Sequence, residues 1–171
     1  MQFTRILLIL TCTFAAIASN AQSTGSLTMR EKMQMFLQQD AFIKPGVGFR
    51  QIRLGISFSE VLDLWGVPEK DEKSVLPGSK RHWFYKPEGA SLIIISGKDT
   101  VETITVRGTP ASIFQTLEGA RFGIAPDRVL RIYGEPSKKP KEDLIRYPEL
   151  GIEFAFANER LGQIDIIEKD I

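Results

Sequence analysis

The sequence GISFSEVLDLWGVPEK at residues 55–70 returns as GIAPDRVLRIYGEPSK at residues 123–138, without a gap in the alignment. The two stretches begin 68 residues apart, at positions 55 and 123. Similarity at a fixed spacing over a block of this size indicates a duplicated structural unit. The duplication is therefore the feature that decides the expected fold.

Each stretch predicts a short helix with a defined beginning and end. Ser57 and Glu60 match a capping box at the start of the first helix. In the second, Pro126 stands in the first turn, where a missing N–H is tolerated. Gly66 and Gly134 suit the left-handed residue that ends a helix, and a proline two residues later prevents continuation. The shared apolar face consists of Phe58, Val61, Leu62 and Trp65 in the first helix and Val129, Leu130 and Tyr133 in the second.

Three strand signals follow each helix, joined by short turns that suit antiparallel neighbours. They cover residues 81–86, 91–96 and 101–107 after the first helix, and 144–147, 152–157 and 163–167 after the second. We therefore expect an α+β fold of two tandem repeats. Each repeat would be a helix followed by a three-stranded antiparallel meander, with the helices packed on one sheet face.

The expected organisation has four parts. Residues 1–21 form a signal peptide, and residues 22–46 form a polar leader with an amphipathic helix that ends near Lys44. The first copy of the repeat spans residues 47–107, and the second copy spans residues 108–171. Between the copies, the segment from Thr109 to Leu117 fits either a helix or an extended linker.

The N-terminal residues match a secretory signal. Residues 1–5 carry one positive charge, residues 6–18 are apolar, and the small residues Ser19 and Ala21 mark a cleavage site. The apolar run is short for a transmembrane span, although an uncleaved anchor is the alternative. We expect a secreted, periplasmic protein that is cut near Ala21, without stable membrane insertion of the mature chain.

Cleavage would remove the single cysteine, Cys12, so the mature chain would hold no disulfide or thiolate site. It would also remove Arg5, which changes the net charge from +1 to zero. A neutral chain lacks the overall attraction to nucleic acid that a basic protein has. We expect no nucleic-acid partner.

Alignment of the strands of the two copies predicts which sheet face is open. Residues at successive strand positions point to opposite faces, so positions that both copies keep apolar should form the core. On that basis the open face is apolar in the first copy and polar in the second, where Arg146 matches Phe84. Exposed apolar surface indicates a partner. The predicted partner-binding residues are Phe84, Lys86, Ile93, Ile95 and Arg146. The alternative is that the stripe of Met29, Met33, Phe36 and Leu37 covers this face, or that the two sheets abut there.

The residue pattern gives little support for a catalytic function. The chain has one histidine, His82, and no Gly-x-Ser-x-Gly elbow. No histidine pair has metal-ligand spacing. We therefore predict no catalytic residue, no cofactor and no metal site.

The Gly-x-Ser-x-x-Glu-Val phrase and the Gly-x-Pro stop at residues 55–68, followed by three strands, resemble the SmpA/OmlA (BamE) domain of bacterial envelope proteins. Their duplication at residues 123–136 is similar to the tandem arrangement of the β-lactamase inhibitor protein fold. The resemblance covers residues 47–171. It implies helices on one face of an antiparallel sheet and non-enzymatic protein binding in the envelope or outside the cell.

Three functions follow as expectations. The first is an envelope scaffold or accessory that docks a protein partner on the open face of the first copy. The second is an inhibitor of a secreted enzyme, with both sheets forming a concave surface around the target. The third is an enzyme.

The signal sequence gives a direct prediction about the mature protein. When the full chain is expressed in its host, N-terminal sequencing and intact mass should give a mature chain that begins at Gln22, because Ser19 and Ala21 provide the small residues that a signal peptidase requires. An intact N-terminus at Met1 would contradict the prediction.

Overall fold

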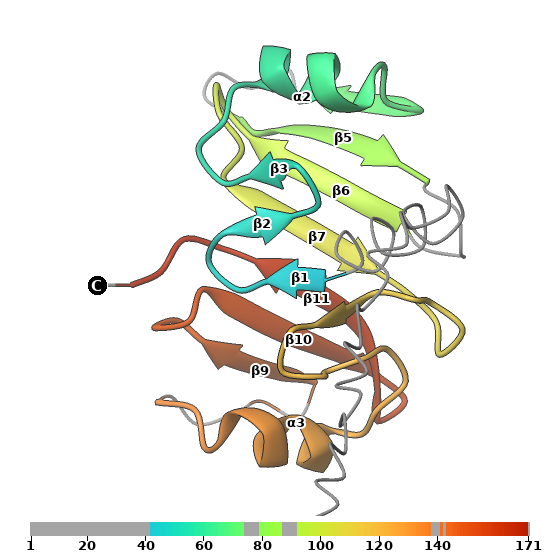
Figure 1. Ribbon diagram of the computed structural model, residues 1–171, viewed down its shortest axis with the longest axis vertical. Helices are drawn as coiled ribbons and strands as arrows, with labels where there is room; N and C mark the ends of the chain where they lie inside the picture. Colours follow the sequence, from blue (N-terminus) through green and yellow to red (C-terminus); the bar gives the residue numbers. More distant parts are fainter. Residues whose placement is uncertain (1–41, 74–78, 87–91, 138–140, 142, 171) are drawn as a thin grey trace, which may run out of the picture.

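The structure is a computed structural model that describes residues 42–73, 79–86, 92–137, 141 and 143–170. Strands dominate these residues: 43% lie in strands and 14% in helices. Figure 1 shows a large sheet with a helix at each end and a smaller sheet lying across its middle. The strands are β1 (Phe42–Lys44), β2 (Gly48–Phe49), β3 (Ile52–Arg53), β4 (Lys70–Lys73), β5 (Arg81–Tyr85), β6 (Leu92–Gly97), β7 (Thr103–Arg107), β8 (Gln115–Thr116), β9 (Leu144–Tyr147), β10 (Ile152–Ala157) and β11 (Arg160–Ile166), and the helices are α2 (Phe58–Trp65) and α3 (Pro126–Tyr133).

The large sheet has seven strands in the order β4-β5-β6-β7-β11-β10-β9. Its strands come from both sequence copies, and they meet where β7 pairs antiparallel with β11. Val106 lies opposite Ile164 at this junction, and Ile104 lies opposite Ile166. All four side chains are fully buried, so the two copies share one core.

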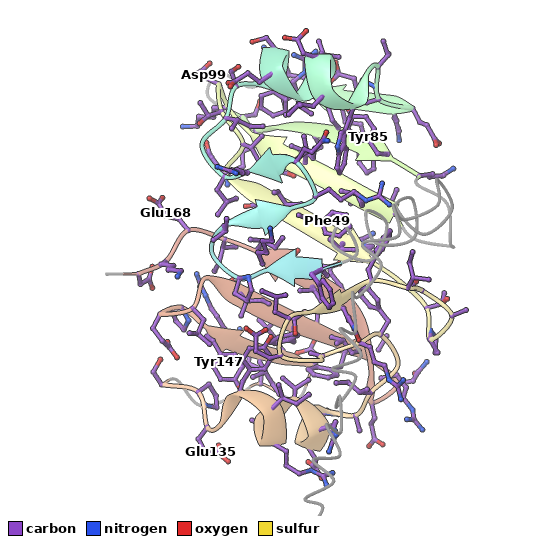
Figure 2. All side chains as sticks on the ribbon, in the orientation of Figure 1. Phe49, Tyr85, Asp99, Glu135, Tyr147 and Glu168 are labelled. Carbon is purple, nitrogen blue, oxygen red and sulfur yellow. The ribbon has the colours of Figure 1, made fainter. Side chains whose placement is uncertain are left out.

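The small sheet has the order β3-β2-β1-β8 and also joins the two copies. β1 runs antiparallel to β2 and parallel to β8, with Ile43 opposite both Phe49 and Thr116. Ile43, Phe49 and Ile52 have no exposed surface and belong to the same core cluster as the apolar face of the large sheet. In Figure 2, Tyr85 and Tyr147 lie near the two helices, with Phe49 between them.

The predicted helix boundaries are confirmed. The Ser57 hydroxyl accepts from the Glu60 amide at 3.2 Å, and the Glu60 carboxylate accepts from the Ser57 amide at 2.9 Å. Gly66 and Gly134 follow the helices with φ of +74° and +80°, in the region that glycine adopts without a Cβ clash. Neither helix in the described part of the chain is long and apolar enough to cross a membrane.

The expected fold class is wrong. The described chain is rich in β-structure rather than α+β, and it does not divide into two helix-plus-meander repeats. The strands that follow the two helices form one sheet, because the pairing of β7 with β11 satisfies backbone groups that separate sheets would leave open. The small sheet was not expected either. It occupies the core face that the prediction assigned to helices alone.

Two local predictions also change. The amphipathic helix expected in residues 22–46 lies mostly outside the described residues, but its last part, Phe42–Lys44, forms strand β1. Pairing with both β2 and β8 gives these residues a sheet partner on each side. The segment from Thr109 to Leu117, which fits either a helix or a linker by sequence, contains the short strand β8.

A close backbone contact holds the small sheet against the end of the large one. The Gly46 amide donates to the Gly151 carbonyl at 3.0 Å. Gly151 has φ of +72°, and a Cβ placed there would lie 2.5 Å from the Gly46 Cα. This contact leaves no room for a side chain.

Gly151→Ala should therefore destabilise the protein by about 2–4 kcal/mol, from the left-handed backbone and the clash together. Gly119→Ala is the matched control, because Gly119 has φ of +95° but no atom within 4 Å of the place that a Cβ would take. It should lose only about 1 kcal/mol. Chemical denaturation of both variants measures the difference, and equal losses would contradict the close contact.

Candidate functional site

The open face of the large sheet is organised by strand register. One row of mutually opposite residues crosses all seven strands, with one residue from each strand. From β4 to β9 it contains Lys70, Phe84, Ile94, Thr105, Asp165, Glu153 and Arg146. The row is apolar only at Phe84 and Ile94 of the first copy, and it is charged at all three positions of the second copy.

Two of the predicted partner-binding residues lie on the wrong face. Ile93 and Ile95 have no exposed surface, and they lie opposite Tyr85 and Trp83 in the core. The one-residue difference in register follows from the pairing of β5 with β6, and such a difference sends every side chain of a strand to the other face. Residues 92–95 are all apolar, so alternation within this strand could not reveal the error. Ile93 and Ile95 are therefore removed from the predicted site.

Phe84, Leu92 and Ile94 are the apolar residues that the register places on the open face of β5 and β6, and we call them the apolar patch. Phe84 and Leu92 are half-buried, and Ile94 is 8% exposed. Lys70 Nζ lies 5.6 Å from the centre of the Phe84 ring. Next to the patch, His82 Nδ1 and Ser96 Oγ are 2.8 Å apart. Leu92 and Ile94 thus take the positions that the sequence assigned to Ile93 and Ile95.

The other two predicted residues lie apart from each other. Lys86 is exposed just beyond the end of β5, with its Nζ 3.5 Å from Glu69 Oε2. Arg146 is on β9, where its Nε lies 2.9 Å from Glu153 Oε1. Phe84 and Arg146 share a row but are separated by five strand-to-strand steps, or roughly 24 Å. The structure does not bring them together into one compact site.

From β7 across the second-copy half of the open face, the polar groups are paired with one another. Thr105 Oγ1 and Gln163 Nε2 both donate to the Asp165 carboxylate, the latter at 2.7 Å. Arg107 Nε donates to Gln163 Oε1 at 2.8 Å. Burial raises the pKa of the Glu153 carboxyl, as does the nearby charge of Asp165, while Arg146 acts in the opposite direction. The open face from β7 to β9 is therefore a network of paired groups.

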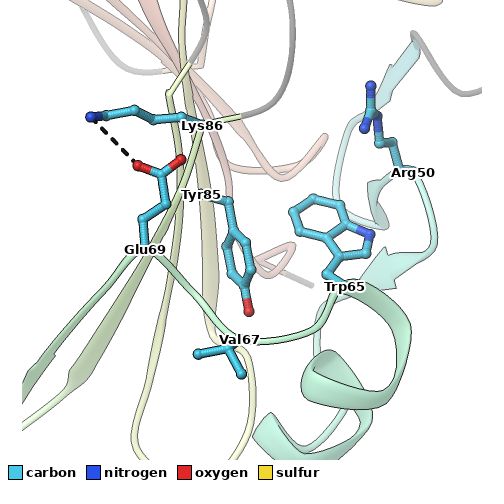
Figure 3. A pocket seen from close by; sticks show the side chains of 6 residues that line it. All are labelled: Arg50, Trp65, Val67, Glu69, Tyr85 and Lys86. Carbon is cyan, nitrogen blue, oxygen red and sulfur yellow. Dashed lines mark ion pairs between the residues drawn. The ribbon is translucent and has the colours of Figure 1, made fainter.

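A second feature lies beside the end of α2. A pocket of about 360 Å³ is lined by residues from the β2–β3 turn, the end of α2 and the end of β5. Figure 3 shows Trp65 and Tyr85 side by side, with Arg50 and Lys86 on either side of them. The lining residues of this Trp65 pocket are Arg50, Trp65, Val67, Glu69, Tyr85 and Lys86.

Aromatic packing fixes the wall of the Trp65 pocket. The rings of Trp65 and Tyr85 meet edge to face, with centroids 5.2 Å apart. The Tyr85 hydroxyl donates to the Gly66 carbonyl at 3.1 Å, which ties the strand to the end of the helix. Burial, with a contribution from the charge of Asp71, raises the pKa of Tyr85 to about 12, so this hydroxyl stays protonated at neutral pH.

Arg50 brings a positive charge to the pocket in a constrained conformation. Its φ is +54°, an uncommon value for a residue with a Cβ. Its guanidinium carbon lies 5.6 Å from the centre of the Phe49 ring and 5.2 Å from that of Phe114. The Arg50 Nε–H is buried and has no hydrogen-bond acceptor among the residues that the structure describes. Sequence reasoning missed this residue.

The described ranges contain no group of three or more His, Cys, Asp or Glu side chains that could hold a metal ion. His82, the one histidine of the chain, is half-buried beside Ser96.

No protein-family model matches the chain, and no curated protein matches it. Among solved structures, a cysteine-rich secretory protein from Staphylococcus aureus subsp. aureus Mu50 aligns with 77% of this chain at 14% identity and a TM-score of 0.51. This chain spans only 48% of the length of that structure. A DUF4309-family protein from Bacillus subtilis subsp. subtilis str. 168 aligns with 81% of this chain and 97% of its own, at 15% identity and a TM-score of 0.50.

These two likenesses concern the fold alone, given their low identity. A candidate β-lactamase inhibitor protein from Streptococcus mutans also matches, covering 77% of this chain and 93% of its own at 12% identity, but its TM-score is 0.31. That value carries no argument for a shared fold or function. The resemblance to a tandem BamE-like domain stays a prediction.

Adjacent substitutions on β6 test the assignment of the two sheet faces. Ile93→Asp should abolish cooperative folding, because it places a charge in the core where Ile93 is fully buried. Leu92→Asp should leave a folded protein that loses no more than about 1–2 kcal/mol, because Leu92 is half-buried on the open face. Thermal unfolding followed by circular dichroism distinguishes the two variants. If Leu92→Asp abolished folding and Ile93→Asp were tolerated, the register expected from the sequence would be correct instead.

Proposed function

We propose that the chain is a secreted, non-enzymatic binding module that receives a protein partner on the apolar patch of Phe84, Leu92 and Ile94. The observation that carries the proposal is the asymmetry of the open face. Its second-copy half is occupied by paired polar groups, whereas its first-copy half carries the half-buried apolar side chains of Phe84 and Leu92 beside the buried Ile94. Apolar surface of this kind marks interaction sites on proteins.

The charged residues next to the apolar patch indicate what kind of partner surface would fit it. Arg107 lies opposite Leu92, and its Nε contacts the neutral amide of Gln163. Lys70 lies over the Phe84 ring at the other side of the patch. The patch is thus apolar, with Arg107 at one edge and the ion pair of Lys70 and Glu72 at the other. A partner surface with an apolar centre and an acidic residue opposite Arg107 would be complementary.

Export is part of the same proposal and rests on the signal sequence of residues 1–21. The role of envelope scaffold or accessory follows from export together with the patch. Lys86 and Arg146, which the sequence predicts as partner-binding residues, are both exposed on or beside the large sheet, and in this proposal they lie at the margins of the interface.

Site-specific crosslinking tests the proposal. A photo-crosslinking amino acid at position 92 should give one discrete protein adduct in the host envelope fraction, because Leu92 lies within the patch. The same amino acid at Asp127 is the control, since Asp127 is exposed on α3, away from the patch. Adding Phe84→Ser should remove the adduct while leaving the circular dichroism spectrum unchanged.

Competition with unlabelled wild-type protein should also remove the adduct if it reports a saturable site. No discrete adduct from position 92, or identical adducts from positions 92 and 127, would overturn the assignment of the partner to this face.

A further inference from the structure

The two sequence copies place different residues beside the aromatic side chain at the end of the helix. In the second copy, Tyr133 replaces Trp65 at the repeat spacing of 68 residues. The Tyr133 hydroxyl donates to the Glu118 carboxylate at 2.6 Å and lies 2.7 Å from Thr116 Oγ1. Thr116 lies in β8, and Glu118 lies in the turn that follows it. A carboxylate of the chain itself therefore sits against the aromatic residue in this copy.

In the first copy the charge at that place is reversed. Arg50 stands 68 residues before Glu118, in the turn between β2 and β3. The position that supplies an acceptor in one copy thus supplies a donor in the other. The buried Arg50 Nε–H has no acceptor within the described residues, and a buried donor without a partner carries an energetic penalty. A ligand that brings an acceptor would remove that penalty.

The rest of the Trp65 pocket sets the character of such a ligand. Arg50 and Lys86 carry positive charge, while Glu69 carries the negative charge and lies near Lys86. The walls are the rings of Trp65 and Tyr85, and Val67 adds an apolar side chain that is 85% exposed. The pocket volume of about 360 Å³ is within the range of small-molecule and side-chain sites.

We propose that the Trp65 pocket binds an organic carboxylate carried on an apolar body. The carboxylate accepts hydrogen bonds from the Arg50 guanidinium, and the apolar body lies against Trp65 and Val67. Such a group can belong to a free carboxylic acid or to the C-terminus of a polypeptide that ends in an apolar residue. This site is separate from the apolar patch and does not depend on a partner docking there.

The test uses the full mature protein labelled with ¹⁵N and follows its two tryptophan indole resonances. N-acetyl-L-phenylalanine at neutral pH should shift the Trp65 resonance in a saturable way. The resonance of Trp83, which is 2% exposed in the core, serves as an internal control. N-acetyl-L-phenylalaninamide lacks the charge and should bind about tenfold or more weakly, because hydrogen bonds to charged groups are the stronger ones.

Variants separate the roles of the two cations. Arg50→Gln should weaken the acid about tenfold or more, and Lys86→Gln should weaken it about two- to fivefold, since Lys86 is solvent-exposed. Arg53→Gln, at an exposed position of β3 in the same hairpin, should bind like the wild type. A pentapeptide that ends in phenylalanine, compared with its C-terminal amide, identifies the source. Tighter binding than the free acid indicates a polypeptide terminus, and equal binding indicates a free acid.

Three results would overturn the proposal. They are no saturable Trp65 shift with the acid, equal binding of acid and amide, or unchanged binding in Arg50→Gln. Because the comparison of acid with amide is made on the wild type, it decides the matter even where Arg50→Gln fails to fold.

Discussion

The antiparallel pairing of β7 with β11 is the contact on which the rest of the structure depends. Each copy spans only about sixty residues, a length at which an isolated domain buries too little surface to be more than marginally stable. Joining their last strands makes one core out of two, through the fully buried side chains of Ile104, Val106, Ile164 and Ile166. The same pairing sends α2 and α3 to opposite ends of the sheet and leaves the middle of the core face to the small sheet (Figure 1).

Local features of the fold could be predicted from the sequence because they rest on neighbouring residues. The capping box of Ser57 and Glu60 and the glycine stops of both helices are of this kind. The fold class and the register of β6 could not, because they depend on which distant strands pair. Lys70–Lys73 gave no strand signal at all, since charged residues are rare in strands, yet they add β4 to the edge of the large sheet.

The candidate sites also contain features that could be predicted from the sequence and features that depend on distant contacts. An apolar half of the open face was expected in the first copy, and the register retains it with Phe84, Leu92 and Ile94 while removing Ile93 and Ile95. The Trp65 pocket was missed, because its residues come from three separate elements. A signal was nevertheless present in the sequence. Positions 50 and 118 align at the repeat spacing and carry opposite charges, whereas positions 65 and 133, which align in the same way, are both aromatic.

The charged strand β4 affects how the edge of the large sheet can associate with other molecules. All four of its side chains are exposed and charged, two positive and two negative, with Lys70 bound to Glu72 and Asp71 bound to Arg81 of β5. A strand edge of this composition is a poor template for an incoming strand, because each added strand would have to bury or displace these ion pairs. Growth of the sheet by edge-to-edge joining of copies is thereby discouraged at this end. Recognition at this end of the molecule therefore rests on side chains rather than on backbone hydrogen bonds.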